Sequence, residues 1–386
     1  MENNNSVCFI AKINEVKAIE GADNIEQVVA GGWNAITKKG EFKQGDLTII
    51  ATTDAVIPEA LSEQMGVANY LRKGTRVRTV KLRGVYSECL IIPLHYLKGK
   101  VSMGEHDLVI EGRDCMEKLG ITKYEPPVKQ IQLASGRKIK WRDNQNFHIY
   151  YKFPNLKNVA GMFTEEDEVQ ITRKIHGTNS RYAIIKKCEL SFWDKVKKWF
   201  GLADEWIDYE YAYGSHNVQK GSDSNGFYST DVWRTIAEKY NIKDKLWEVA
   251  RSMSKEELGT GLVLYGEIYG PGIQGKGYDY RLTEIQFEGF DVTIDGKYLS
   301  TDTTQIVIEN LLELPHVEVL YEGKWNQEVQ DSFIFNNFIN GTKTPHEGVV
   351  VKHTSGERQK VAKCINPDYL IFEEKHILDT DIVYNH

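Results

Sequence analysis

The sequence predicts an α+β protein in which a small antiparallel barrel precedes a larger domain of antiparallel sheets flanked by helices. Short strand-like runs broken by turn residues fill the chain up to about residue 119. Longer apolar strand-like runs alternate with amphipathic helical segments after about residue 151. With 386 residues the chain is also too long for one ordinary hydrophobic core, so its length favours two or three domains.

The composition is that of a globular protein, and it limits the kinds of partner. Apolar residues make up 41% and charged residues 27% of the chain, so no long disordered region is expected. The formal net charge of -7 argues against attraction to nucleic acid over the whole surface, and any such binding needs a local basic surface. The five cysteines are scattered and never have C-x-x-C spacing, which favours a reducing compartment over a disulfide framework or a zinc site.

The start of the chain shows no targeting or membrane signal. The first six residues are polar and lead into a strand-like run, and no apolar stretch is long enough to span a bilayer. We therefore expect a cytoplasmic or nuclear protein without a signal peptide or membrane contact, and we expect it to be a monomer.

Six short strands and two short helices are predicted in the N-terminal region. The strands are predicted at 8–16, 26–30, 34–37, 47–51, 76–82 and 89–93, and the helices at 58–65 and 114–119. Strands at such short spacing are typical of a small barrel, and we expect one of the OB type. Pro126 and Pro127 cannot continue a helix or a central strand, so we expect an OB-like nucleic-acid-binding module over 1–127 and a linker or edge segment over 128–150.

One basic surface stands out in this acidic chain. Between Tyr70 and Gly84 there are six basic residues and no acidic one: Arg72, Lys73, Arg76, Arg78, Lys81 and Arg83. Basic side chains along a β-surface can pair with phosphates whatever the base sequence, which predicts nucleic-acid binding here. The alternative is a solvated strand face that prevents edge-to-edge pairing. The basic positions change strand parity between Arg78 and Lys81, so one regular strand cannot present them all on one face without a bulge.

The second domain, expected over 151–386, alternates helices with apolar strands. Helices are predicted at 231–240, 243–252, 301–314 and 328–337, and strands at 261–269 and 285–293. A further amphipathic helix is predicted within 187–209, because large apolar residues recur there at three- and four-residue offsets: Phe192, Trp193, Val196, Trp199 and Phe200. We expect this stripe to pack onto its own domain, although the helix could instead clamp nucleic acid or bind a partner.

The chemistry of the chain centres on Lys174, which ends a strand-like run. Gly177 follows it, and a second apolar run begins at Tyr182. A lysine at a strand end, followed by a glycine that lets a turn approach closely, can present its amine to an α-phosphate, as a covalent nucleotidyltransferase requires. On these residues alone, a solvated lysine in a hairpin turn is almost as good an explanation.

Six stretches in fixed order resemble the motifs of covalent nucleotidyltransferases, and of ATP-dependent RNA ligases in particular. They are KIHGTN (174–179), YGSHN (213–217), LYGEIYG (264–270), GFDV (289–292), HEGVVVK (346–352) and KVAKC (360–364), which resemble motifs I, Ia, III, IIIa, IV and V. The stretches at 21–24, 32–33, 45–46, 81–84 and 119–127 resemble the N-terminal OB module of RNA ligase family 5, the Deinococcus-type and Naegleria-type RNA ligases. The resemblance covers nearly the whole chain and implies an ATP-grasp-like ligase domain behind the OB-like barrel.

The resemblance also implies a role for each matching residue. Lys174 would be the nucleophile that takes AMP from ATP, and Lys363 would neutralise the α-phosphate. Glu267 and Glu347 would be catalytic and bind Mg²⁺ or Mn²⁺, since hard carboxylates suit such ions. Glu347 is the better metal candidate, and Glu267 could instead bind the AMP ribose. The residues implied to bind ATP are Lys174, Gly177, Asn179, Ser215, His216, Asn217, Glu267, Phe290, Lys352, Lys360 and Lys363, with Phe290 stacked on adenine.

Three positions depart from the wider superfamily pattern. His176 stands where the superfamily prefers Asp, which favours an RNA ligase over a DNA ligase. Arg173 stands where related ligases often have an acid, which argues against an adenine contact there. Ile365 stands where motif V often has a second lysine; Lys360 could compensate, or fewer charges could hold the phosphate.

The sequence thus predicts an ATP-dependent RNA ligase that joins 3′-OH and 5′-phosphate ends through a lysyl-AMP intermediate and an adenylylated 5′ end. The resemblance implies that the substrate is RNA or an RNA-containing nicked duplex, with ribonucleotides on the 3′-OH side. One alternative is an mRNA-capping guanylyltransferase, but that family normally places its OB domain after motif V, and only 23 residues follow Lys363. The other is a non-catalytic RNA-binding protein, which has no reason to retain all four proposed catalytic side chains.

Overall fold

The structure is a computed structural model of the chain, and it divides into two compact units. It describes residues 6–53, 55–97, 109–124, 144–159, 161–216, 219, 231–273, 278–335, 337–357 and 359–373. Unit 1 comprises Met1–Lys129, Pro154–Met162 and Ile365–Lys375, and unit 2 comprises Gln130–Phe153, Phe163–Cys364 and His376–His386. No helix among the described residues is long and apolar enough to cross a membrane.

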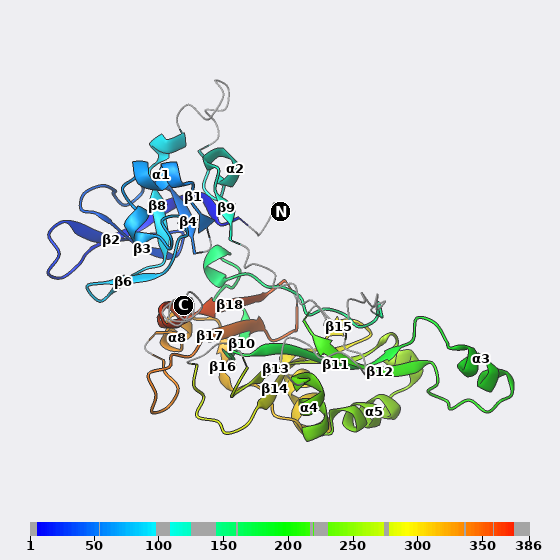
Figure 1. The fold of residues 1–386 in the computed structure, drawn as a ribbon. Helices are drawn as coiled ribbons and strands as arrows, with labels where there is room; N and C mark the ends of the chain where they lie inside the picture. Colours follow the sequence, from blue (N-terminus) through cyan, green and yellow to red (C-terminus); the bar gives the residue numbers. More distant parts are fainter. Residues whose placement is uncertain are drawn as a thin grey trace, which may run out of the picture. The chain divides into compact units, whose positions relative to one another are not determined.

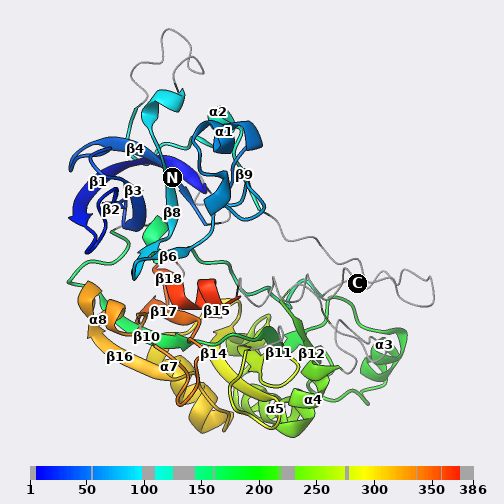
Figure 2. The ribbon, with the colours of Figure 1, turned by 60° about the vertical axis from the view of Figure 1, so that its left-hand side comes forward.

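Unit 1 is built on five antiparallel strands in the order β3-β2-β1-β4-β8, which curl around one another in Figures 1 and 2. The strands are β1 (Cys8–Ala18), β2 (Ile25–Ala30), β3 (Trp33–Lys38), β4 (Leu47–Thr52) and β8 (Cys89–Ile92). The register of β1 shifts between Ile13 and Glu15, so its first half pairs with β4 and its second half with β2. Glu88 donates its backbone N–H to the carbonyl of Asn34 at 2.7 Å, which brings the last strand against β3 and nearly closes the barrel.

Smaller elements complete unit 1, and they include one departure from the predicted strands. These elements are α1 (Glu59–Gln64), α2 (Met116–Leu119), the pair β5 (Ala55–Val56) and β9 (Thr122–Lys123), and the hairpin β6 (Val80–Leu82) and β7 (Val85–Ser87). The strand predicted at 76–82 is therefore wrong except for its last three residues. The backbones of Arg72 and Arg76 hydrogen-bond to each other at 2.8 and 3.0 Å across a tight turn, and Arg76 and Val77 pair with Val56 and Ala55 of β5, so residues 76–79 do not extend β6.

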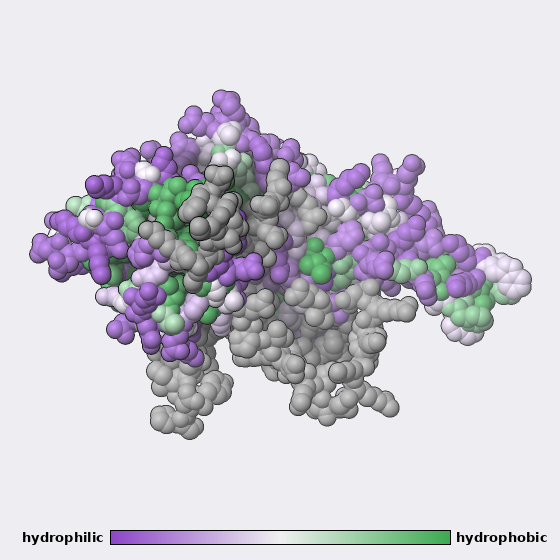
Figure 3. Space-filling view, turned by 90° about the horizontal axis from the view of Figure 1, so that it is seen from above, coloured by the Kyte–Doolittle hydropathy of each residue, from purple (hydrophilic) through white to green (hydrophobic). Residues whose placement is uncertain are grey.

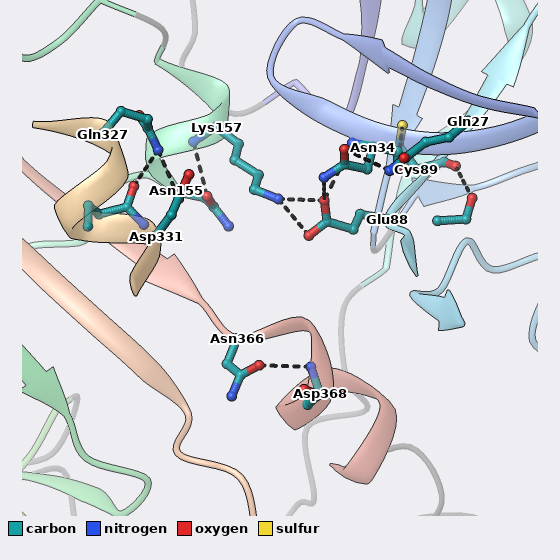
Figure 4. A network of polar contacts seen from close by, with 12 residues as sticks. Gln27, Asn34, Glu88, Cys89, Asn155, Lys157, Gln327, Asp331, Asn366 and Asp368 are labelled. Carbon is teal, nitrogen blue, oxygen red and sulfur yellow. Dashed lines mark hydrogen bonds and ion pairs between the residues drawn. The ribbon is translucent and has the colours of Figure 1, made fainter. Parts of the chain in front are cut away.

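A polar network attaches the segment Pro154–Met162 to the barrel within unit 1. Both carboxylate oxygens of Glu88 lie 2.5 Å from Nζ of Lys157, and one of them also accepts a hydrogen bond from the side chain of Asn34 at 2.9 Å (Figure 4). Asn155 caps the 3₁₀ turn η4 (Leu156–Asn158) by accepting from the backbone N–H of Lys157. Because Glu88 is buried, its charge requires such partners, and they hold this segment in place.

Unit 2 contains two antiparallel sheets, and consecutive strands β10 and β11 belong to different ones. The first sheet has the order β16 (Val319–Lys324), β10 (Glu168–Lys174), β17 (Gly348–His353) and β18 (Val361–Ile365). The second has the order β12 (Tyr209–Ser215), β11 (Thr178–Lys186), β13 (Gly261–Tyr269), β14 (Gln286–Ile294) and β15 (Lys297–Tyr298). The chain therefore passes from one sheet to the other just after Lys174.

Helices cover one face of the second sheet and form the main core of unit 2. They include α4 (Val232–Lys239), α5 (Ile242–Ser252), α6 (Lys255–Leu258), α7 (Thr301–Ile306) and the π-helical turn η5 (Val307–Leu311). Trp233 is buried and packs in a cluster with Leu264 and Phe287 of the sheet. The helix predicted at 301–314 continues only to residue 311, and that predicted at 328–337 is shorter, as α8 (Gln327–Ser332).

The amphipathic helix α3 (Phe192–Trp199) forms as predicted, but its apolar stripe does not pack onto the domain. Phe192, Trp193, Trp199 and Phe200 are 72%, 69%, 82% and 63% exposed. A capping box of Ser191 and Asp194 begins the helix, and ion pairs from Lys187 to Asp194 and from Lys198 to Asp208 hold it. Figure 1 shows α3 beyond the ends of β11 and β12, and Figure 3 shows apolar side chains gathered at that tip. Among the described residues, the expected packing is therefore wrong for these four aromatic side chains.

Candidate functional site

The site begins at Lys174, at the junction of the two sheets of unit 2. Lys174 pairs with Gly348 of β17. The backbone then turns at Gly177, and from Thr178 it pairs with β13. A Cβ on Gly177 would clash with the carbonyl oxygen of Ile268, so this turn needs glycine for its close approach to β13. The strand-end lysine and the close turn predicted from the sequence are both present.

Glu347 is the direct partner of Lys174. One oxygen of its carboxylate lies 2.5 Å from Nζ of Lys174, and the other lies 3.6 Å from Nδ1 of His176. Burial alone would raise the pKa of Glu347, but Lys174 and His176 outweigh burial, so the pKa lies below its ordinary value. An ionised carboxylate therefore orients the amine at the strand end.

Glu267 lies on β13, opposite Asn179 of β11, and is close enough to respond to the charges of Lys174 and Glu347. Burial raises the pKa of Glu267 to about 8; Lys174 opposes this shift and Glu347 reinforces it. The amide oxygen of Asn179 is buried and has no hydrogen-bond partner among the described residues. A carboxyl group that favours its neutral form, opposite an unsatisfied amide oxygen, fits a place where a cation and its water ligands would bind.

The carboxylates of Glu267 and Glu347 suit a hard divalent cation that keeps water ligands, rather than a metal held by protein ligands alone. No group of three or more His, Cys, Asp or Glu side chains arranged to hold a metal occurs in the part of the chain that the structure describes. Mg²⁺ usually keeps several waters and takes one or two protein carboxylates. Glu267 and Glu347 would supply two.

Phe290 lies in an aromatic cluster above a buried ion pair. Its ring packs edge-on to Tyr150, with 5.0 Å between the centroids. Beneath it, Nζ of Lys352 lies 2.8 Å from Oδ2 of Asp291 and donates to the carbonyl of Phe290 at 2.7 Å. Tyr150 donates its hydroxyl to the same Asp291 oxygen. Lys352 therefore fixes the backbone of Phe290 by joining β17 to β14.

The residues of the YGSHN stretch lie beside two basic side chains that the sequence analysis did not select. The carbonyl of Ser215 accepts a hydrogen bond from Nε of Arg181 at 2.9 Å. Burial lowers the pKa of His216, and the positive charges of Arg181 and Lys152 lower it further. An arginine inside the apolar run of β11 was the available signal for Arg181. Asn217 lies outside the described residues.

The two lysines of the KVAKC stretch have different surroundings. Lys360 hydrogen-bonds to Asp167, which precedes β10, whereas Lys174 ends that seven-residue strand. Seven residues of strand span about 20 Å, so Lys360 lies at the far end of β10. Asp167 holds Lys360 there, away from Lys174, and its compensation for Ile365 at the phosphate stays a prediction. Lys363 lies within β18, which adjoins β17 in the sheet.

The six basic residues of unit 1 lie in the turn at 72–76, in the β6–β7 hairpin and, for Arg78, between the two. Lys73 and Arg83 occupy turn positions with positive φ values of 51° and 48°. The guanidinium carbon of Arg76 lies 3.8 Å from the centroid of the Tyr124 ring, and Lys81 donates to the hydroxyl of Tyr86 at 2.8 Å. Arg78 donates to the carbonyl of Tyr70, and Arg72 belongs to the turn. Lys73, Lys81 and Arg83 are the exposed members of the set.

Sequence reasoning also missed two tyrosines beside the motif I turn. The backbone N–H of His176 donates to the hydroxyl of Tyr280 at 2.7 Å, and the ring centroid of Tyr278 lies 4.4 Å from that of the His176 imidazole. Both tyrosines lie in the connection between β13 and β14, which has no helical or strand periodicity. The close spacing of two aromatic hydroxyls after a glycine-rich stretch was the available signal.

Comparison with known proteins gives both family and fold. A family model described as RNA ligase matches residues 167–365, which are 199 of the 386 residues, and one described as an OB-fold domain matches residues 7–94. The structure titled "Naegleria gruberi RNA ligase with PPi" is similar with a TM-score of 0.67 at 22% identity, over 96% of this chain and 99% of that chain. A mutant of the same ligase with ATP and Mn gives a TM-score of 0.67 at 23% identity, with the same coverage. No curated protein matches the chain. The predicted α+β fold with an N-terminal OB domain is confirmed.

Proposed function

Because this chain belongs to the RNA ligase family, we propose that it is an ATP-dependent ligase that works through a lysyl-AMP intermediate. The observation that carries this proposal is the meeting of Lys174, Glu347 and Glu267 where the two sheets of unit 2 join. The likeness in fold to the Naegleria ligase with ATP and Mn supports ATP and a divalent metal, Mg²⁺ or Mn²⁺, as cofactors.

In the first step, the amine of Lys174 attacks the α-phosphate, a nitrogen–phosphorus bond forms and pyrophosphate leaves. Glu347 orients the amine, but a salt-bridged ammonium is not a nucleophile, so the proton must leave Lys174 before attack. A divalent cation at Glu267 and Glu347 would supply the positive charge that keeps both carboxylates ionised and favours the neutral amine. Lys363 would neutralise charge that builds up on the α-phosphate.

The nucleotide would bind along the strands that lead to Lys174. Phe290 would stack on adenine, held in place by the buried pair of Lys352 and Asp291. Gly177 of the turn, Asn179 of β11, and Ser215 and His216 at the end of β12 would contact the ribose or phosphates, as would Asn217. This arrangement makes Lys352 a support of the adenine platform.

In the later steps, AMP passes to a 5′-phosphate, and a 3′-OH then attacks that phosphate and displaces AMP. We propose a nicked duplex with ribonucleotides on the 3′-OH side as the substrate and a monomer as the acting form. The basic surface of unit 1, with Lys73, Lys81 and Arg83 exposed, would bind the RNA backbone. All five cysteines are described and free, which fits action in the cytoplasm or nucleus.

The first test is incubation with ATP or GTP labelled at the α-phosphate, with Mg²⁺, followed by a denaturing gel. The proposal expects label from ATP in the wild-type protein and none in Lys174→Ala. Label from GTP would indicate a capping-type guanylyltransferase, and no label from either nucleotide would indicate a non-catalytic RNA-binding protein. Nicked duplexes that differ only in a ribose or deoxyribose at the 3′-OH end would then test the proposed substrate.

A further inference from the structure

The connection between β13 and β14 returns to the motif I turn through the hydroxyl of Tyr280. This hydroxyl accepts from the backbone N–H of His176 at 2.7 Å and lies 3.1 Å from the carbonyl oxygen of the same residue, to which it donates. The β10–β17 ladder ends at Lys174, so the peptide groups of His176 have no strand partner there. One side chain therefore satisfies both polar groups of the backbone two residues after the nucleophile.

The hydroxyl of Tyr278 makes the equivalent contacts with the other side of the site. It donates to the carbonyl of Pro345 at 2.9 Å and is hydrogen-bonded to the backbone N–H of Glu347. The rings of the two tyrosines also lie against each other, with 4.9 Å between their centroids. The resulting chain of contacts runs from the backbone of His176, through the two packed tyrosines, to the backbones of Pro345 and Glu347.

The rings of both tyrosines are held by further contacts. The ring of Tyr278 lies against the His176 imidazole, with 4.4 Å between centroids, and the ring of Tyr280 lies 4.9 Å from that of Tyr269 at the end of β13. Tyr269 in turn donates to a carboxylate oxygen of Glu288 at 2.5 Å. The hydroxyls are therefore held in position by the second sheet, independently of the ladder between β10 and β17.

From this geometry we infer that Tyr278 and Tyr280 are positioning residues that hold Glu347 against Lys174 for adenylylation. The inference rests on the proposed function of Lys174 as the nucleophile. The last pair of the β10–β17 ladder is Lys174 and Gly348. The chain after Lys174 and the chain before Gly348 form two separate loops, which this ladder does not hold together. Tyr278 and Tyr280, here called the tyrosine bridge, join these two loops. Without the bridge, the Lys174 amine and the Glu347 carboxylate can move apart, and small displacements of reacting groups slow catalysis strongly.

The informative variants are Tyr280→Phe and Tyr278→Phe, because phenylalanine keeps the ring contacts and removes only the hydroxyl. The matched control is Tyr209→Phe. The Tyr209 hydroxyl also donates to a backbone carbonyl, that of Gly259 at 2.8 Å, and burial raises its pKa as it does for Tyr278 and Tyr280. Tyr209 lies at the opposite end of β12 from Ser215. A purely structural role would reduce stability in all three variants and leave the chemical step unchanged.

The experiment measures the single-turnover rate of self-adenylylation over a range of ATP concentrations. Either bridge variant is expected to lower the rate at saturating ATP by about 10- to 100-fold, as for other lost positioning contacts, with the ATP concentration for half-maximal rate changed much less. The double variant should be little slower than the worse single one, because the two packed tyrosines hold the same two loops together. Rates within about twofold of the Tyr209→Phe control would overturn the inference.

A second readout needs no ATP and separates failure of the bridge from failure of the proposed function. Acetic anhydride modifies amines, and peptide mass spectrometry reports the modification rate of Lys174 in each intact variant. Release of Lys174 from the charge-assisted contact with Glu347 should make it react at least about threefold faster in Tyr280→Phe than in the control. If the wild-type protein takes no label from ATP, the proposed function fails, and equal Lys174 reactivity in variant and control would still refute the bridge.

Discussion

The end of β10 and the helix α3 are the two regions that the sequence singled out most clearly, and they are built in opposite ways. Around Lys174, charged side chains are half-buried and held by one another, and the Tyr280 hydroxyl holds the backbone of the turn beside them. At α3, aromatic side chains are exposed, and ion pairs at the surface hold the helix. In the first arrangement, charges are partly removed from water, which costs free energy unless they are paired. In the second, apolar surface stays exposed to water.

The difference shows what each kind of sequence pattern reports. Helical periodicity reports which side chains share a face, and it correctly predicted α3, but it contains no information on what covers that face. A glycine near a lysine at a strand end predicts that the backbone closely approaches another part of the chain. That contact is present between Gly177 and β13.

The largest expected effect compares two tryptophans. Trp233 is 4% exposed and donates its indole N–H to the carbonyl of Asn179 at 3.0 Å, whereas Trp199 is 82% exposed. Trp233→Ala should lower the free energy of unfolding by about 3–5 kcal/mol, while Trp199→Ala should change it by less than about 0.5 kcal/mol. Denaturant unfolding followed by circular dichroism measures both. Equal losses would show that α3 packs against the protein after all.

The next prediction concerns the carboxylate that orients the nucleophile. Glu347→Gln keeps the shape of the side chain but removes the charge that contacts Lys174, so the rate of self-adenylylation should fall by about 100-fold or more. The control is Glu322→Gln on β16, where Glu322 accepts from Gln170 in the same sheet. A rate for Glu347→Gln close to that of the control would contradict the proposed site.

A smaller effect concerns Lys360, whose contribution to the melting temperature should depend on pH. The hydrogen bond from Lys360, with those from Thr164, lowers the pKa of Asp167 to about 2. A depressed carboxyl pKa stabilises the folded protein above the ordinary pKa, and this contribution is lost as the pH falls toward 2. Lys360→Met should therefore melt at a lower temperature than the wild type at neutral pH, and the difference should shrink between about pH 4 and pH 2.

Self-adenylylation at neutral pH gives the companion measurement. Lys363→Met should slow it strongly because of its proposed phosphate contact, whereas Lys360→Met should change it little, since Lys360 lies at the far end of β10. A similar loss in both variants would restore Lys360 to the site.

The smallest expected effect concerns the exposed cations of unit 1. Lys73→Ala should weaken RNA binding modestly and reduce the slope of log affinity against log salt concentration by about one. Self-adenylylation should stay unchanged. Fluorescence anisotropy with a labelled duplex at several salt concentrations measures the slope, and an unchanged slope would remove Lys73 from the binding surface.

Much of the secondary structure follows from local pattern. The strand predicted at 261–269 is β13, because its apolar residues fit a strand covered on both faces. The strand predicted at 76–82 shrinks to β6 because Arg76 and Val77 pair with β5 rather than with β7. Helix α7 and the π-helical turn after it replace one predicted helix, and nothing in the local pattern distinguishes the two forms.

The sequence by itself determined the order of the motifs, the lysine that the strand delivers and the family to which the chain belongs. Those features depend on residue type and spacing, which can be read along the chain. Only the tertiary structure decided that Glu347 contacts Lys174, that Lys360 contacts Asp167 and that Tyr280 binds the turn at His176. Each of these contacts joins segments far apart in sequence, and strand pairing and sheet order determine which distant side chains meet.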